Sequence, residues 1–336
     1  MSLSPVEDIA LSEFSPGTVA EPAAPGSGFV GRSPGQLAWA RLRRDRVAMV
    51  SGGVLVFFFL VALAAPLIQW AYGTDPQQQF QDSLDLYGMP LGYAGGVTGS
   101  HWFGLEPSLG RDIFIRMVYG LRTSLFIALA AGVITTVIGV LAGVLAGYAG
   151  GWLDAVIGWV TDFALAMPFL IVALALVPTV SLRFYGPREA VPSSFRVAVL
   201  ITVFALFGWT SAARLVRGQV VSLREREFIE AARASGVSTA HMLFRQVLPN
   251  IWAPILVSFS LAVPSYVTGE AVLSFLGVGI VDPTPDFGAM IFRSIHYLQT
   301  DPTYVFFPGV TIFILVLAFN LFGDAVRDAL DPRSNR

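Results

Sequence analysis

The sequence predicts an all-α membrane protein with six transmembrane helices, an amphipathic interfacial helix before the second span, and a hairpin of short helices between the fourth and fifth spans. Of the 336 residues, 54% are hydrophobic and only 13% are charged. The mean hydropathy of +0.66 lies well above that of an ordinary globular chain. A helix needs about 20 apolar residues to cross about 30 Å of hydrocarbon. Six charge-free runs supply the spans, the fourth with its flanks included, at 47–74, 123–153, 163–182, 197–213, 246–269 and 302–323.

The segments outside the spans are predicted in chain order. Residues 1–35 contain five prolines and four acidic side chains with little apolar periodicity, which is typical of a disordered tail. Residues 36–75 form a juxtamembrane segment and the first span, which starts near residue 47 and is too long and too late for a cleaved signal peptide. An extracytoplasmic loop with the amphipathic helix follows at 76–120, and a five-helix core occupies 121–336.

The arginines indicate the orientation of the chain. All 21 basic residues are arginine. If the N-terminus is cytoplasmic, 14 of them fall on the tail, the turn near 149–152, the loop at 214–249 and the C-terminus, against seven on the other side. Because cytoplasmic segments are enriched in basic residues, we expect both termini and the loop at 214–249 in the cytoplasm.

Residues 111–122, directly before the second span, have the pattern of an amphipathic helix. The apolar side at helical spacing consists of Ile113, Phe114, Met117, Val118 and Leu121. We expect this helix at the outer membrane interface, either as a support or gate beside the mouth of a pathway or as a plain interfacial anchor. The candidate gate residues are Arg111, Asp112, Arg116, Tyr119 and Arg122.

The loop at 214–249 has the pattern of two short helices joined by a glycine. Residues 224–235 form the first helix, and Gly236 stops it because glycine tolerates positive φ. Small alanines would let another protein's backbone approach closely, and Glu227 and Glu230 would offer carboxylates to a basic rim. A solvated loop with incidental alanines is the alternative.

The second short helix of the hairpin has its own start and stop signals. Ser238 or Thr239 can cap it. It is expected to run through Met242 and Leu243 and to end before Pro249.

Ionisable and small residues inside the spans have candidate roles. Asp162 lies about ten residues into the third span, hence roughly 15 Å deep, as a polar inward-facing residue or as a hydrogen-bond partner of a neighbouring helix. Glu270 is expected near the outer interface as a helix-end or loop-anchoring residue. Gly139, Gly143 and Gly147 recur every four residues, which predicts close helix packing within the bundle or at a subunit interface.

No constellation of catalytic residues is found. The chain has no cysteine, and without lysine it cannot form a phosphate-binding Walker loop. The three histidines, at 101, 241 and 296, lack ligand spacing, so we expect no metal site. An ion-coupled secondary transporter is an alternative class but would have several mid-span charges. A membrane scaffold without transport is a further alternative.

The hairpin resembles a known motif. Glu230-Ala231-Ala232, Gly236 and Leu248-Pro249 are similar in spacing to the EAA loop of bacterial ABC importer permeases, with Gln246 as a departure from the usual aliphatic residue. In that family the short coupling helix docks in a cleft of the cytoplasmic ATPase. The resemblance implies that the coupling residues are Glu227, Glu230, Ala231, Ala232, Gly236, Leu248 and Pro249.

Three further stretches resemble the C-type permease subunit of oligopeptide and dipeptide (peptide/nickel) importers. They are Gly110-Arg111-Asp112 with Tyr119-Gly120-Leu121-Arg122-Thr123, then Leu273-Ser274-Phe275-Leu276-Gly277, and finally Asn320-Leu321-Phe322-Gly323-Asp324. The resemblance covers roughly residues 36–333. The stretch 104–109 departs from the family pattern.

The resemblance implies an assembly and a substrate class. The chain would be the translocation subunit of a binding-protein-dependent importer in the bacterial inner membrane, without a cofactor of its own. It would pair with a homologous second permease subunit, two ATPase subunits that bind ATP and Mg, and an extracytoplasmic binding protein, with lipid and no nucleic acid as its other surroundings. Peptides are the expected substrates, and nickel chelates, glutathione and haem are the alternatives within the family.

Overall fold

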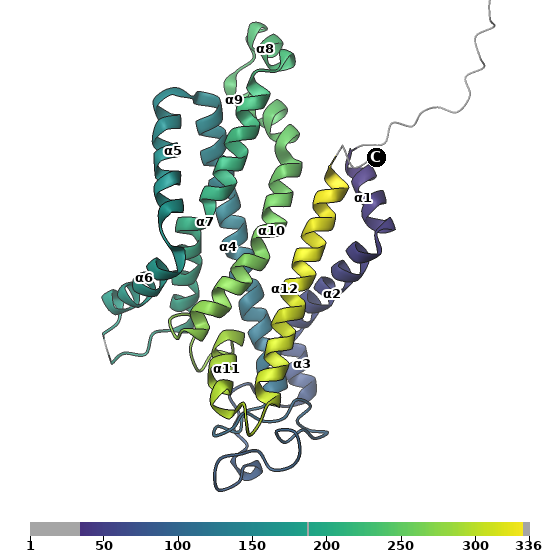
Figure 1. Cartoon of the computed structure of the whole chain (residues 1–336), viewed down its shortest axis with the longest axis vertical. Coiled ribbons are helices and arrows are strands. Elements are labelled where there is room, and N and C mark those ends of the chain that lie inside the picture. Colours follow the sequence, from purple (N-terminus) through teal and green to yellow (C-terminus); the bar gives the residue numbers. More distant parts are fainter. Residues whose placement is uncertain (1–33, 187, 332–336) are drawn as a thin grey trace, which may run out of the picture.

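The computed structural model describes residues 34–186 and 188–331, which form helices and no β-strand (Figure 1). The predicted all-α class is therefore confirmed. The predicted tail lies outside the described residues except for its last two, which begin the first helix. The elements are α1 (Pro34–Arg44), α2 (Arg46–Leu63), α3 (Ala65–Tyr72), η1 (Gln81–Ser83), α4 (Ile113–Ala149), α5 (Gly151–Ala166), α6 (Phe169–Phe184), α7 (Ser193–Arg224), α8 (Glu227–Ala234), α9 (Thr239–Met242), η2 (Leu243–Val247), α10 (Leu248–Phe275), α11 (Phe287–Ser294), η3 (Ile295–Tyr297) and α12 (Thr303–Leu330).

Five helices of the described chain are long and apolar enough to cross a membrane: α2, α4, α7, the continuous helix of α9, η2 and α10, and α12. Helices α5 and α6 supply a sixth span if the pair, bent by 89°, counts as one. Six spans agree with the prediction, but the third is a bent pair of helices rather than one straight helix at 163–182, because Pro168 divides this run. Met167 has φ −75° and ψ 130°, the extended conformation that a following proline favours.

Helices α4 and α7 pack closely along a stripe of glycines on α4. A Cβ atom at Gly143 would lie 2.6 Å from the carbonyl oxygen of Ala213, and one at Gly147 would lie 2.8 Å from the Cβ of Val220. Such distances are too short for a real side chain, so only glycine permits this approach of the two backbones. The predicted small-residue packing is confirmed and lies within the bundle.

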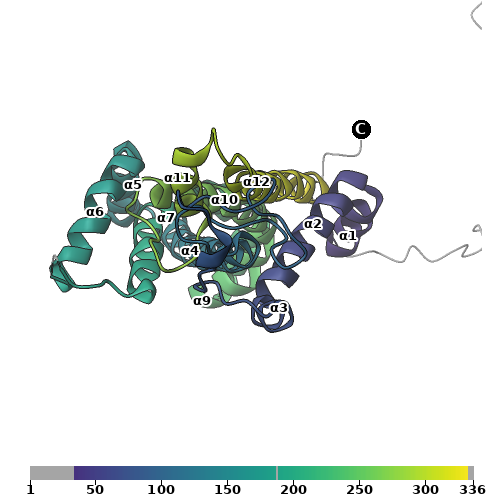
Figure 2. The ribbon, with the colours of Figure 1, turned by 90° about the horizontal axis from the view of Figure 1, so that it is seen from below.

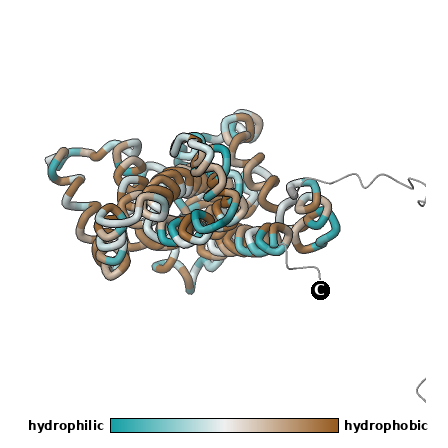
Figure 3. The backbone as a smooth tube through the Cα atoms, turned by 90° about the horizontal axis from the view of Figure 1, so that it is seen from above, coloured by the Kyte–Doolittle hydropathy of each residue, from teal (hydrophilic) through white to brown (hydrophobic). Residues whose placement is uncertain are grey.

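The bundle has two distinct ends. The hairpin end carries α8, α9, α1 and the end of α12, and the loop end carries α11 and the segment 73–112 (Figure 1). Figure 2, viewed from below, shows this segment spread across the ends of the spans. Figure 3, viewed from the hairpin end, shows hydrophilic stretches in front of helices that are mainly hydrophobic.

The predicted interfacial helix is not a separate element. Residues 113–122 are the first turns of α4, and Ile113 and Ile115 are fully buried. The loop end covers them: the Ile113 N–H donates to the carbonyl oxygen of Gly104 at 3.1 Å, and the Asp286 backbone lies against Gly120. The apolar face was read correctly from the sequence, but it packs against protein rather than lying at the membrane interface.

Candidate functional site

The hairpin is held to the bundle by one buried side chain. Ile229 of α8 has no exposed surface and belongs to one buried apolar cluster with Val144 of α4, Val220 of α7, Met242 of α9 and Ile251 of α10. Because this buried cluster joins α8 to α4, α7, α9 and α10, movement of α8 would be transmitted through it to three long helices.

The turn after α8 depends on the backbone of Gly236. Its φ is +74°, a left-handed conformation in which side-chain-bearing residues are strained. The Gly236 N–H donates to Arg233 O at 3.0 Å, and the Val237 N–H donates to Ala232 O at 3.1 Å, which closes the helix C-terminus. A Cβ at Gly236 would meet no atom, so the requirement is conformational rather than steric. The prediction that Gly236 stops the helix is confirmed.

The second half of the hairpin begins as predicted but does not end as predicted. The Ser238 side chain accepts the His241 N–H at 3.4 Å and caps α9. The chain then continues through the π-helical turn η2 into α10, with Pro249 in the first turn of α10. The prediction of an end before Pro249 is wrong, because the helix continues past Pro249, which closely follows the π-helical turn where the regular i→i−4 hydrogen bonds are already interrupted.

The outward surface of the hairpin combines small, acidic and aromatic residues. Glu227, Glu230 and Ala231 are exposed, Phe228 is 46% exposed, and Ala232 is half-buried. Within the described chain, the carboxylates of Glu227 and Glu230 form no ion pair. Leu248 is half-buried and Pro249 exposed, at the base of the hairpin. This surface belongs to a defined helical hairpin, but its carboxylates have no ion-pair partner within the described chain. Such a surface suits contact with another protein.

Charges at the loop end are arranged in the opposite way, around Glu106. This carboxylate is 1% exposed. It accepts Arg111 Nε at 2.7 Å and the Tyr304 hydroxyl at 2.5 Å, and Arg293 Nε lies 3.1 Å away. Burial raises the pKa of Glu106, but the hydrogen bond from Arg111 and the positive charges of Arg293, Arg116 and Arg111 outweigh it, so the pKa lies below its usual range.

A second carboxylate, Asp282, completes what we call the loop-end cluster: Glu106, Arg111, Arg116, Asp282, Arg293 and Tyr304. Asp282 Oδ1 lies 3.1 Å from both Arg111 Nη1 and Arg116 Nη2, and Asp282 also pairs with Arg293. Arg116 Nη1 donates to Pro76 O at 3.1 Å. The cluster thus joins the segment 73–112, α4, the α10–α11 connection, α11 and α12.

The predicted gate residues are only partly brought together. Arg111 and Arg116 belong to the loop-end cluster, whereas Asp112 caps α4 by accepting the Ile115 N–H at 3.0 Å. The other oxygen of Asp112 lies 2.8 Å from both the Tyr72 hydroxyl and His101 Nδ1. Tyr119 donates to Gln69 of α3. Arg122 is exposed and lines a groove of about 810 Å³ outside the cluster.

Four members of the loop-end cluster were not singled out by the sequence analysis: Glu106, Asp282, Arg293 and Tyr304. The sequence did contain a signal. Arginines that are buried near an interface need acidic partners to offset their charge, and Glu106 lies in the stretch 104–109, which departs from the family pattern. Nothing local indicated Tyr304, which is 198 positions away from Glu106.

The ionisable residues Asp162 and Glu270 differ in their exposure. The Asp162 side chain is 72% exposed and pairs with Arg214 of α7 at 2.6 Å, which confirms the interhelical bond but not an inward-facing position. Glu270 is fully buried and accepts hydroxyls of Ser124 at 2.8 Å and Ser274 at 2.9 Å. It joins α10 to α4 near the end of α10, so this residue anchors two spans from a buried position and not from the exposed position that an interface would give it.

One lateral face of the bundle, formed by α7, α10 and α12, carries a groove of about 950 Å³. Ser211, Ser258 and Ser265 line it, and their hydroxyl groups make no hydrogen bond within the described residues. Ser211 and Ser265 are exposed, and with Gly208 they also line an adjoining pocket of about 290 Å³. Unbonded hydroxyls within spans disfavour contact with lipid, so this face is suited to water, substrate or another subunit.

Multiple spans, a polar lateral groove and an exposed hairpin held at one end are features of a membrane transport subunit. The chain belongs to the family of binding-protein-dependent transport system inner membrane components, which residues 139–336 match. Residues 33–87 match the N-terminal TM domain of oligopeptide transport permease C. The chain is therefore a permease subunit of an ABC importer, a multi-pass protein of the inner membrane.

Named relatives extend the match over most of the chain. It is 36% identical over 303 residues to the dipeptide transport system permease protein DppC of Alkalihalophilus pseudofirmus, covering 90% of each protein. It is 38% identical over 307 residues to the glutathione transport system permease protein GsiD of Salmonella typhimurium, covering 90% of this chain and 91% of GsiD. A chain of the MetNI methionine ABC transporter, solved in inward-facing conformations, shares the fold with a TM-score of 0.51 and 20% identity, over 64% of this chain and 96% of that chain.

These comparisons confirm the predicted family and the importer function. Permease subunits of this family are generally non-catalytic, and ATP and Mg belong to partner ATPases. Membership also implies ATPase and substrate-binding partners.

Proposed function

We propose that this permease subunit imports peptides. The observation that carries the proposal is its 36% and 38% identity, over 90% of its length, to permeases named for dipeptide and glutathione transport. Both substrates contain peptide bonds, which offer N–H and C=O groups whatever the side chains. Hydroxyl groups can bond either kind, so the serine-lined groove suits a substrate class defined by its backbone.

The assembly that we propose contains a homologous second permease subunit, two ATPase subunits and an extracytoplasmic binding protein. The hairpin end faces the cytoplasm, both termini are cytoplasmic, and the distribution of arginines supports this orientation. The ATPase receives the hairpin surface at Glu227, Glu230 and Ala231, and the turn at Gly236 presents it. The support is that these charges are exposed and unpaired within the described chain.

Coupling in this proposal follows from the packing of Ile229. Closure of the ATPases on ATP moves the hairpin, and the buried cluster that contains Ile229 transfers this movement to α4, α7 and α10. Two packings of the bundle then open the pathway to opposite sides, and the ATPase contact favours one of them. The substrate does not contact the hairpin.

The pathway in this proposal runs along the lateral groove, between this chain and the second permease subunit. Ser211 and Ser265 line both the lateral groove and the adjoining pocket, so they would contact substrate in either one. The gate at the loop end is built on Arg111, Asp112, Arg116, Tyr119 and Arg122, of which Arg122 is the exposed member. Buried Arg111, Asp112 and Arg116 hold the frame of this gate.

The experiment is reconstitution of the full complex in proteoliposomes with its binding protein. ATP-dependent uptake of a radiolabelled dipeptide should be competed by unlabelled di- and tripeptides, including glutathione. Competition by a nickel chelate or haem, and not by peptides, would contradict the peptide proposal. Uptake that collapses with an ionophore while ATP remains would instead indicate an ion-coupled transporter.

The absence of cysteine in the chain allows a second test, of the pathway. Single variants Ser211→Cys and Ser265→Cys should react with a membrane-impermeant thiol reagent and be protected by substrate. Leu141→Cys, at an exposed apolar position of α4, is the control and should stay unreactive. Equal reactivity at all three positions would contradict the assignment of the pathway.

A further inference from the structure

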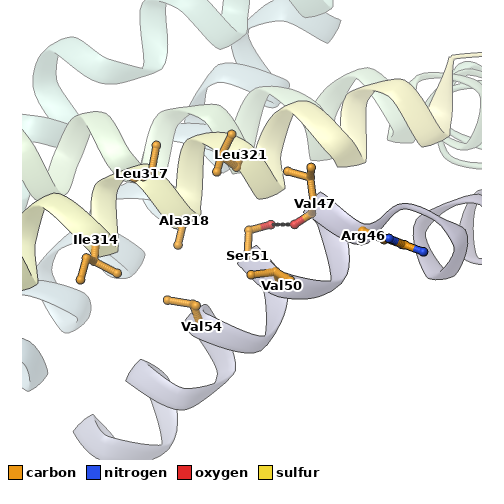
Figure 4. A pocket seen from close by; sticks show the side chains of 9 residues that line it. All are labelled: Arg46, Val47, Val50, Ser51, Val54, Ile314, Leu317, Ala318 and Leu321. Carbon is orange, nitrogen blue, oxygen red and sulfur yellow. Dashed lines mark hydrogen bonds between the residues drawn. The ribbon is translucent and has the colours of Figure 1, made fainter.

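A narrow groove lies between α2 and α12, away from the serine-lined face (Figure 4). Its volume is about 400 Å³. Seven apolar side chains form its walls: Val47, Val50, Val54, Ile314, Leu317, Ala318 and Leu321. Ser51 also lines it, but its hydroxyl donates to Val47 O at 2.7 Å and to Ala48 O at 3.3 Å. The groove therefore offers no free polar group along its length.

One end of this groove is cationic. Arg46, the first residue of α2, is the only charged residue among the described residues that line the groove, and Figure 4 shows it beyond the apolar side chains. Arg43 and Arg44 are exposed one turn earlier, at the end of α1. None of these three guanidinium groups forms an ion pair within the described chain.

The carboxylate adjacent in the chain, Asp45, offsets only part of this positive charge and leaves a surplus. The carboxylate of Asp45 is engaged as the cap of α2, where Oδ1 accepts the Val47 N–H at 2.7 Å and the Ala48 N–H at 3.3 Å. The Arg43 guanidinium lies 5.0 Å from the ring centroid of Trp39, which is itself more than half exposed. An exposed tryptophan beside exposed arginines is the composition of a membrane–water interface.

We propose that this groove binds an anionic phospholipid, with one acyl chain along the apolar walls and the phosphate at Arg46, next to Arg43 and Arg44. An apolar groove between two spans is filled by hydrocarbon rather than by water. An arginine fork matches phosphate oxygens in pairs. A zwitterionic lipid could fill the groove equally well, but it would leave the surplus positive charge of the three arginines unmatched. Net negative charge on the headgroup is therefore the selective feature.

The test uses the intact complex in a zwitterionic detergent, titrated with dioleoyl-phosphatidylglycerol or dioleoyl-phosphatidylcholine and observed by native mass spectrometry. The wild type should retain more phosphatidylglycerol than phosphatidylcholine. Arg46→Gln should reduce retention of phosphatidylglycerol roughly fivefold, as expected for one basic residue near a lipid headgroup, and leave phosphatidylcholine unchanged. Val50→Trp, at an exposed wall position, should reduce retention of both lipids.

Matched controls separate this site from general attraction. Arg183→Gln removes an exposed arginine at the end of α6 and should not change the preference. The proposal fails if the wild type retains both lipids equally, if Arg46→Gln keeps the full preference, or if Arg183→Gln loses it. Displacement of the lipid by millimolar inorganic phosphate would also overturn it, because the acyl chain would then contribute nothing. Cross-linking of a Val50→Cys variant to another subunit would show that protein covers the groove instead.

Discussion

The two ends of the bundle use charge in opposite ways. At the loop end, Glu106, Arg111 and Arg116 are buried and bonded to one another. At the hairpin end, Glu227 and Glu230 are exposed and unpaired within the described chain. Burial of a charge costs solvation energy that close opposite charges must offset, so the loop-end charges hold one another in place. The hairpin is attached to the bundle by apolar packing, and its charges stay free to bind a partner. The hairpin end therefore has the character of a contact surface, and the loop end that of a structural frame.

The largest effect should follow from removing a charge from the loop-end cluster. Arg116→Met leaves the buried Glu106 and the partly exposed Asp282 with fewer partners, and removing a buried member of an ionic network in this way costs about 3–5 kcal/mol. Thermal unfolding of the purified subunit in detergent should show a correspondingly large drop in Tm. Arg122→Met, at an exposed position of the same helix, is the control and should change stability by less than about 0.5 kcal/mol. Equal losses in both variants would contradict the distinction between a buried frame and its surface.

The next largest effect should follow from cutting the apolar attachment of the hairpin. Ile229→Ala leaves a cavity among α4, α7, α9 and α10, and such truncations cost about 2–5 kcal/mol. Because Ile229 holds the hairpin rather than the loop end, amide hydrogen exchange should accelerate across 227–243 and stay slow across 113–122. Dipeptide uptake should fall while the ATPase subunits still hydrolyse ATP. Phe228→Ala, which removes an exposed ring, should leave the exchange pattern intact.

A smaller effect should follow from changing the turn of the hairpin. Gly236→Ala places a side chain at φ +74°, a strain of about 1–2 kcal/mol, and should lower the coupling of ATP hydrolysis to uptake more than it lowers Tm. Gly218→Ala is the matched control. Gly218 lies in α7 with ordinary helical φ and open space for a Cβ, so alanine there should be neutral or stabilising by about 0.5–1 kcal/mol. The same sign for both substitutions would contradict the conformational role of Gly236.

The hairpin was more predictable from the sequence than the loop end, for a physical reason. Gly236 and Ser238 act on N–H and C=O groups within a few residues of themselves, so their spacing is a local signal. The loop-end cluster joins Glu106 to Tyr304 across 198 positions, and no periodicity records such a contact. Proline was ambiguous, because the same residue type breaks the chain at Pro168 and opens α10 at Pro249.

The smallest expected effect is a change of stability at acidic pH. It distinguishes the two ends of the bundle by the protonation of a single carboxyl group. The pKa of Glu106 is held below its usual value near 4.5 by the surrounding arginines, so the folded state binds the proton less readily than the unfolded state. The stabilisation from Glu106 is therefore complete above about pH 4.5 and is lost as the pH falls through the lowered folded value. The difference in Tm between wild type and Glu106→Gln should be constant from pH 7 to pH 5 and shrink below pH 4.5. Glu230→Gln, at the exposed hairpin, should show no such convergence. A Glu106→Gln difference that persists undiminished at pH 3 would mean that the role of Glu106 is not ionic, and the contrast between the two ends would then rest on burial alone.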